Sequence, residues 1–152
     1  MGAIGRLIVG MLPIAPKFII KRIAGRYVAG SDIQSAITLM KEMTKENTCF
    51  TIDVLGEDIT NLDEARFFVQ EYSNVLDAIV LNQINANISI KPTALGLLLD
   101  RNVAIENILE IMTKASINDI FVRLDMEDHR VTQETIEIVL LMQEKGFENI
   151  GT

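Results

Sequence analysis

The chain has 152 residues, of which 49% are hydrophobic and 23% charged, and its formal net charge is −7. This length suits one domain with a sizeable core, and the composition is globular rather than disordered. The acidic balance argues against nucleic acid as a partner, because a phosphate backbone attracts basic surfaces. One histidine and one cysteine leave too few ligands for a zinc site of the usual kind, and we predict no metal site.

Residues 1–30 differ from the rest, because they are basic and apolar and contain no acidic residue. The apolar run 4–11 is too short to span a bilayer. We predict an N-terminal helical segment over residues 1–30, packed on the domain that follows. A basic amphipathic helix over about residues 15–27 in contact with an anionic membrane surface is the alternative.

Cys49, in the apolar run 48–52, is predicted to be a small core residue. A single cysteine cannot form an internal disulfide, which indicates a reducing compartment. We therefore expect a cytoplasmic protein, with peripheral contact at the inner membrane left open by the basic segment.

From residue 31 onward, strand-like and helix-like segments alternate. Strands are predicted at residues 49–55, 87–91 and 119–125, with the start of a fourth at 147–152. Helices precede or separate them, each with apolar residues at helical spacing. The predicted helix signals are a capping box of Ser31 and Gln34, a cap at Thr60 for a helix to Leu81, a helix from Asn102 to Lys114, and a cap at Thr132.

This alternation is typical of βαβ units and a parallel sheet, and so predicts the α/β class. The strand spacing suits a (βα)8 barrel or a doubly wound sheet, and no glycine-rich phosphate loop follows any strand, which disfavours a nucleotide fold of the Rossmann kind. We predict that residues 31–152 form the N-terminal half of a TIM-type barrel, with about three βα units and the start of a fourth strand. A complete barrel needs about 250 residues, so we expect this chain to be part of something larger.

Polar residues follow the predicted strands at the ends that would line one mouth of a barrel. At or just beyond the ends of these strands lie Asp53 and Glu57 for the first, Lys91 and Thr93 for the second, and Arg123, Asp125, Met126, Glu127 and Asp128 for the third. Lys91 ends an apolar strand and is followed by Pro92, which is typical of a fixed charge facing a substrate carboxylate, or of a Schiff-base amine. An ion pair with Asp125 or Asp53 that only closes the barrel is the third interpretation.

Three stretches, 89–93 (Ser-Ile-Lys-Pro-Thr), 121–128 (Phe-Val-Arg-Leu-Asp-Met-Glu-Asp) and 146–152, resemble proline dehydrogenase, a flavin-dependent bacterial enzyme family. Residues 26–30 and 51–57 match in order and spacing, so the resemblance covers about residues 25–152. It implies a (βα)8 barrel that holds FAD at its mouth. It also implies oxidation of L-proline to 1-pyrroline-5-carboxylate by hydride transfer to the flavin, with electrons passed to a membrane quinone.

The resemblance also implies roles for individual residues. Lys91 would bind the substrate carboxylate, Asp125 would be the active-site acid, and Met126 would lie against the flavin. We expect Arg123 to lie one layer deeper and organise Asp125. Asp53 and Glu57 are expected to support the residues that contact the substrate. His129 is predicted to be a solvated turn residue rather than a base.

In this family the later strands and the last helix supply most flavin contacts and the arginines that grip the proline carboxylate. We therefore expect the chain alone to bind FAD poorly and to be inactive without a C-terminal barrel half or self-association. Two other functions stay open. One is a Schiff-base or aldolase-type barrel that uses Lys91, and the other is a non-catalytic half-barrel that assembles with a partner.

Overall fold

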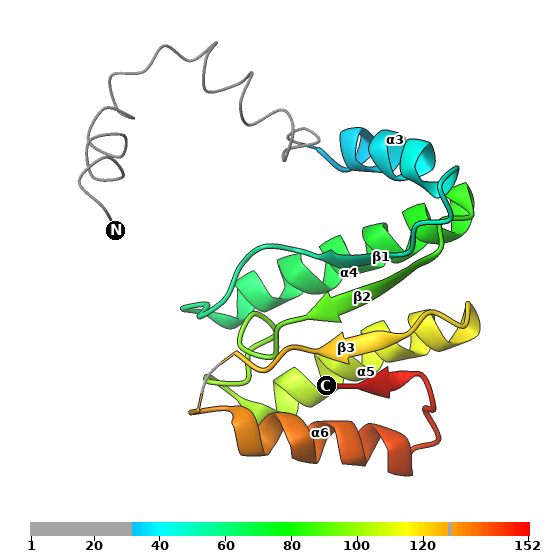
Figure 1. Ribbon diagram of the computed structural model, residues 1–152. Helices are drawn as coiled ribbons and strands as arrows, with labels where there is room; N and C mark the ends of the chain where they lie inside the picture. The colour runs from blue at the N-terminus through cyan, green and yellow to red at the C-terminus, as the bar shows by residue number, and fades with distance from the viewer. Residues whose placement is uncertain (1–31, 128) are drawn as a thin grey trace, which may run out of the picture. The chain divides into compact units, whose positions relative to one another are not determined.

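A computed structural model describes residues 32–127 and 129–152 (Figure 1). The predicted N-terminal segment 1–30 and the predicted cap Ser31 lie outside the described residues. Helix α3 (Ile33–Thr44) begins after Asp32, whose carboxylate accepts hydrogen bonds from the backbone N–H of Ser35 at 2.9 Å and from its hydroxyl at 3.1 Å. Asp32 therefore caps α3.

Residues 40–152 form a compact unit built on one sheet of four parallel strands. The strands, in sheet order, are β1 (Phe50–Asp53), β2 (Ala86–Ile90), β3 (Val122–Leu124) and β4 (Ile150–Gly151). Their arrowheads point the same way in Figure 1. The predicted α/β class and parallel order are confirmed. Strands β1, β3 and β4 are shorter than predicted, because the apolar runs extend beyond the paired ladder, whereas β2 has the predicted length and begins one residue earlier.

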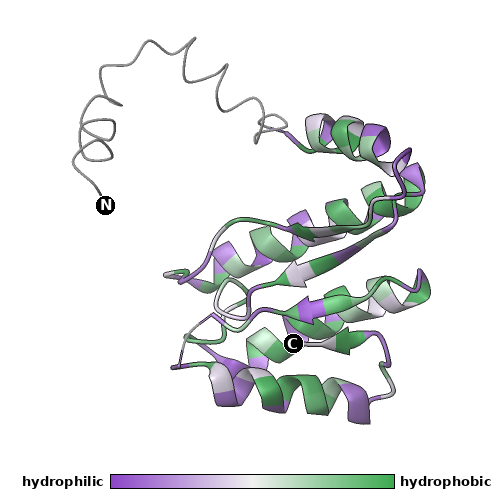
Figure 2. Ribbon diagram, in the orientation of Figure 1, coloured by the Kyte–Doolittle hydropathy of each residue, from purple (hydrophilic) through white to green (hydrophobic). Residues whose placement is uncertain are grey.

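Three helices connect successive strands: α4 (Leu62–Asn82), α5 (Arg101–Ile117) and α6 (Thr132–Glu144). In Figure 2 each helix carries both hydrophobic and hydrophilic residues, as expected for helices with one buried face. Ile88, Val122 and Ile150 lie side by side in the sheet register, and all three belong to the core that the helices cover. The residues that alternate with them must therefore point to the opposite face of the sheet.

The helix starts differ in detail from the predicted ones. The N-cap of α4 is Asn61, whose side chain accepts a hydrogen bond from the backbone N–H of Glu64, whereas the hydroxyl of the predicted cap, Thr60, donates to the Glu64 carboxylate at 2.8 Å. The N-cap of α5 is Asp100. Helix α6 begins at Thr132 itself, with Val131 at the N-cap position, so the predicted cap is wrong by one residue.

Cys49 is exposed, so the predicted core position is wrong. It precedes β1, which lies at an edge of the sheet. The apolar residues around Cys49 do not indicate that β1 is an edge strand. Among the helices of residues 32–127 and 129–152, none combines the length and the apolar character needed to cross a membrane.

Gly56, in the loop after β1, is a position where a larger residue should be costly. Its φ is +150°, and a Cβ there would lie 2.2 Å from Cζ of the buried Phe68 ring. We expect Gly56→Ala to lower the free energy of unfolding by about 2 kcal/mol more than Gly146→Ala, because Phe68 must move. Gly146 also has a positive φ, of +94°, but an added Cβ there would have no atom within 4 Å. Urea unfolding of both variants measures the difference, and equal losses would contradict the packing argument.

Candidate functional site

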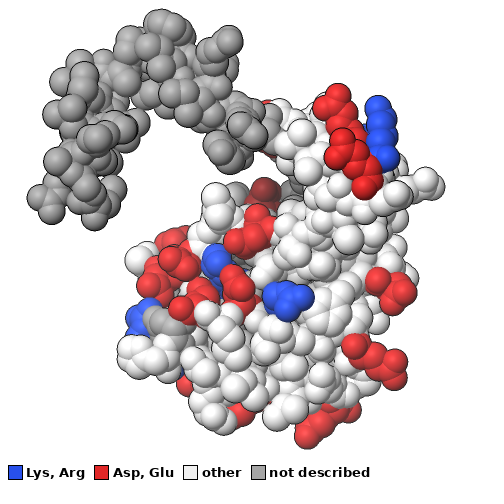
Figure 3. Space-filling model, viewed as in Figure 1, with Lys and Arg blue, Asp and Glu red and all other residues white. Residues whose placement is uncertain are grey.

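The carboxyl ends of the strands carry the polar residues of the candidate site. Asp53, Ser89 and Arg123 lie side by side in the sheet register, on the face turned away from the core. Two residues further along their strands, Lys91 and Asp125 point to the same face. Figure 3 shows acidic and basic side chains gathered beyond the arrowheads of the strands.

Lys91 lies between two carboxylates from neighbouring strands. Its Nζ donates to Oδ2 of Asp125 at 2.9 Å and lies 3.5 Å from Oδ2 of Asp53. The hydrogen bond that Lys91 donates to Asp125 and the charge of Asp53 raise the pKa of the Lys91 ammonium, despite the opposing effect of burial. Lys91 is therefore a fixed cation, and the predicted convergence of the strand ends is confirmed for these three residues.

Tyr72, on α4, extends this cluster into the core. Its side chain is fully buried, and its hydroxyl lies 3.1 Å from Oδ1 of Asp53 and 2.9 Å from the carbonyl oxygen of Ser89. The backbone N–H of Val54 donates to the same hydroxyl at 3.3 Å. Burial, with the charge of Asp53, raises the pKa of Tyr72 far above its ordinary range, so the hydroxyl keeps its proton.

A second cluster joins the three loops that follow β1, β2 and β3, and we call it the loop junction: Asp58, Thr93, Glu127 and Arg130. The Glu127 carboxylate accepts from the backbone N–H of the buried Thr93 at 2.9 Å and from its hydroxyl at 2.5 Å. The N–H of Asp58 donates to the Thr93 hydroxyl at 3.2 Å, and the Arg130 guanidinium pairs with the Asp58 carboxylate at 3.2 Å. The junction therefore holds the segments that carry Lys91 and Asp125.

Glu127 should make stability depend on pH. Burial raises its pKa above the ordinary value of 4.5, although both hydrogen bonds from Thr93 lower it. A carboxyl group whose pKa is higher in the folded than in the unfolded state stabilises the fold fully at pH values below its pKa in the unfolded state. This contribution is lost as the pH rises through its pKa in the folded state. We expect Glu127→Gln, whose amide can still bond Thr93, to lack this loss. Urea unfolding across pH 4 to 8 should show wild type losing stability relative to the variant, and a constant difference would contradict the assignment.

The other predicted site residues take different positions. Met126 is 44% exposed, and Glu57 is exposed. His129 was predicted to be a solvated turn residue, and it lies in an exposed turn. Arg123 lies two residues before Asp125 on the same face. However, its guanidinium donates to the carbonyl of Thr152 at 3.1 Å and lies over the Phe121 ring, 5.6 Å from its centroid. Arg123 thus lies one layer deeper than Asp125, as predicted, but its guanidinium has these partners instead of organising Asp125.

Reasoning from sequence did not assign Tyr72, Asp58 or Arg130 to the candidate site, and it missed the partner of Thr93. Tyr72 lies at helical spacing with the apolar residues of α4, which by itself indicates only a core position. Its hydroxyl is the signal that could have distinguished it, since a buried hydroxyl requires a partner. Thr93 follows Lys91 and Pro92 in the chain, but its bond to Glu127 joins residues 34 positions apart. Neither partner could be read from local spacing.

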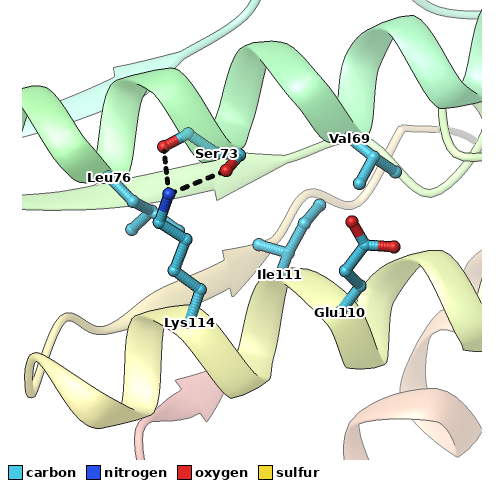
Figure 4. A pocket seen from close by; sticks show the side chains of 6 residues that line it. All are labelled: Val69, Ser73, Leu76, Glu110, Ile111 and Lys114. Carbon is cyan, nitrogen blue, oxygen red and sulfur yellow. Dashed lines mark hydrogen bonds between the residues drawn. The ribbon is translucent and has the colours of Figure 1, made fainter.

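A cavity between α4 and α5 lies away from these residues (Figure 4). Its lining includes Val69, Leu76, Ile111 and Lys114. The Lys114 ammonium donates to the hydroxyl of Ser73 at 2.8 Å and pairs with Asp77 at 2.6 Å. Lys114 thus joins α5 to α4. Because it is also a lysine paired with a carboxylate, but away from the strand ends, it serves as a matched control for Lys91.

Comparison with known proteins finds a matching family and related sequences. The family model described as proline dehydrogenase matches residues 36–152. The chain is 34% identical over 129 residues to "Proline dehydrogenase 1" of Bacillus subtilis, a match that covers 85% of this chain and 42% of that protein. It is 31% identical over 134 residues to "Proline dehydrogenase" of Deinococcus radiodurans, covering 86% of this chain and 43% of that protein.

The fold is also similar to a solved structure. The crystal structure of proline utilization A from Bdellovibrio bacteriovorus inactivated by N-propargylglycine matches with a TM-score of 0.76 at 22% identity, over 89% of this chain and 17% of that chain. This match supports the fold, a four-stranded part of a βα barrel. The chain spans about two fifths of the length of the curated relatives it matches. With the family model matching most of its length, the chain belongs to the proline dehydrogenase family.

Proposed function

We propose that this chain supplies the N-terminal part of a proline dehydrogenase, which oxidises L-proline to 1-pyrroline-5-carboxylate. The observation that carries the proposal is the position of Lys91. In a chain of this family, a fixed cation lies between Asp125 and Asp53 at the carboxyl ends of parallel strands. Active sites of βα barrels lie at these ends.

The charges of the cluster suit an amino acid that carries both an ammonium and a carboxylate. The Lys91 ammonium would bind the proline carboxylate, and Asp125, held by Lys91 at 2.9 Å, would face the substrate as the active-site acid. The ion pair raises the pKa of Lys91, so the ammonium that would bind the carboxylate is present before substrate binds.

The residues present fit a flavin. Met126, directly after Asp125, exposes 44% of its surface, and Leu55, after β1, exposes 87%. Exposed apolar side chains next to a charged cluster suit the face of a planar ring, and a thioether adapts well to such a surface. We propose that Met126 contacts FAD, which when bound would accept the hydride from proline.

A Schiff-base function for Lys91 is less well supported. A nucleophilic lysine needs a lowered pKa, so that the neutral amine is present. Asp125 and Asp53 instead raise the pKa of Lys91.

Three parts of the proposal concern partners and place. We propose a quinone as the electron acceptor and a cytoplasmic location, with peripheral contact at the inner membrane. The support is the basic, acid-free composition of residues 1–30, which lie outside the described residues. We also propose that the site is completed by a C-terminal barrel half or by self-association, since the chain spans about two fifths of its relatives.

The test uses two proteins. One is the complete gene product, and the other is a chimera in which this chain replaces the matched segment of Proline dehydrogenase 1 of Bacillus subtilis. We expect flavin absorbance and proline-dependent dye reduction in at least the chimera. A folded chimera that binds flavin but leaves proline unoxidised would contradict the proposal. A stable, flavin-free oligomer of the gene product, together with an inactive chimera, would favour the non-catalytic assembly instead.

A further inference from the structure

Helix α4 carries one polar atom in an otherwise apolar buried face. The structure describes the whole helix, and its buried side chains are Ala65, Phe68, Val69, Tyr72, Val75, Leu76 and Ile79. A phenylalanine at position 72 would fill the same volume without requiring a buried hydrogen bond. The hydroxyl of Tyr72 therefore needs an explanation beyond packing.

This hydroxyl joins three elements at one point. The N–H of Val54, after β1, donates to it, and it lies within hydrogen-bond distance of the Ser89 carbonyl on β2 and of Oδ1 of Asp53 on β1. Its single proton can go to only one of these two acceptors at a time. When the proton is directed at Asp53, the hydroxyl donates to Oδ1 from a position that helix packing holds in place.

The other oxygen of the same carboxylate, Oδ2, lies 3.5 Å from Nζ of Lys91. That distance is longer than the 2.9 Å bond from Lys91 to Asp125, so this contact depends more on how the carboxylate is turned. A lysine ammonium has three N–H groups. With Asp125 and Asp53 as the partners of two of these N–H groups, the third N–H can donate to a ligand.

We infer that Tyr72 and Asp53 are positioning residues: the Tyr72 hydroxyl orients Asp53, and Asp53 is the second anchor of the Lys91 ammonium. The inference adds two positioning residues to the proposed site, and it rests on the proposed function only for the identity of the substrate. Two anchors fix the direction of the ammonium, whereas Asp125 alone leaves it free to rotate about one bond. The residues act through Lys91, so they should influence substrate binding more than the chemical step.

The first test follows Lys91 and needs no catalytic activity. Competitive labelling of the complete gene product with an amine reagent, read by mass spectrometry, reports the reactivity of each lysine. We expect Lys91 to be labelled about five-fold faster in Tyr72→Phe and in Asp53→Asn than in wild type, because the ammonium loses an anchor. Lys114 serves as the internal standard, since its partners Ser73 and Asp77 are unchanged.

A control separates positioning from a general loss of stability. Val69→Ala removes two methyl groups from the same buried face of α4, one turn from Tyr72, and leaves the hydroxyl in place. It should lower stability without changing Lys91 labelling. Equal labelling of Lys91 in wild type and folded Tyr72→Phe would overturn the inference, as would the same change in Val69→Ala. If Tyr72→Phe fails to fold, Asp53→Asn decides alone.

A double-mutant cycle tests the order of action. If Tyr72 acts through Asp53, adding Tyr72→Phe to Asp53→Asn should change labelling little, whereas additive effects would overturn this route. In the active protein or chimera, Tyr72→Phe should raise KM for proline about five-fold with kcat nearly unchanged. Altered labelling without proline oxidation in any variant or in wild type would refute the proposed function and leave the positioning role intact.

Discussion

Lys91→Met should lower kcat/KM for proline by about 30-fold. Methionine keeps most of the side-chain volume but removes the cation that pairs with Asp125 and Asp53. Truncating one partner of a hydrogen-bonded charge pair costs about 2 kcal/mol or more, and each 1.4 kcal/mol is about tenfold in rate. Steady-state proline oxidation by the complete gene product, or by the chimera, measures the loss.

Lys114→Met is the matched control. It removes an ion pair and two hydrogen bonds that join α5 to α4, but none of these contacts involves the strand ends. Its kinetic constants should stay near wild type while its urea midpoint falls. If Lys91→Met also kept wild-type kinetics, Lys91 would have only a structural role.

Asp125→Asn should lower kcat by about 100-fold, the scale of a positioned acid or base. Asparagine has nearly the same shape and can still accept the Lys91 hydrogen bond, so the change removes the charge while the fold is kept. Without that charge the pKa of Lys91 should also fall, because Asp125 raises it through a charged hydrogen bond and through its charge, and a neutral amide stabilises the ammonium less. Proline turnover and the pH profile of kcat/KM together measure both effects.

Asp77→Asn provides the comparison for Asp125→Asn. Asp77 also pairs with a lysine, Lys114, but on the helix layer and with 68% of its side chain exposed. An exposed pair contributes little to stability, so we expect near wild-type turnover. A similar loss in both variants would mean that turnover follows overall charge, and the role of Asp125 would then be unsupported.

The order of elements could be predicted from the sequence because helices and strands each have their own spacing of apolar residues. Helical spacing placed α4 and α5, and the charged residues after β2 and β3 marked the ends that meet. The polar partners were harder to predict. The Asn61 cap, the Thr93–Glu127 bonds and the Tyr72–Asp53 contact depend on side-chain directions across loops, which spacing does not encode.

The two errors at β1 and β3 have the same origin. Cys49 lies in an apolar run but at a sheet edge, where one side lacks a neighbouring strand. Arg123 was expected to organise Asp125, yet a side chain on a strand also reaches across to the next strand, and the Thr152 carbonyl lies there. In both cases the sequence pattern was interpreted along the chain, whereas the presence or absence of a neighbour across the sheet decided the outcome.

The sheet register has a consequence for how this chain tolerates insertions and deletions. Deleting one residue within β3 would exchange the two faces, so that Arg123 and Asp125 would enter the core in place of Val122 and Leu124. The same deletion between α4 and β2, near Gln83, would shorten a connection at the opposite ends of the strands. Length variation among natural relatives should therefore be confined to the connections before the strands, while the strands keep a constant residue count.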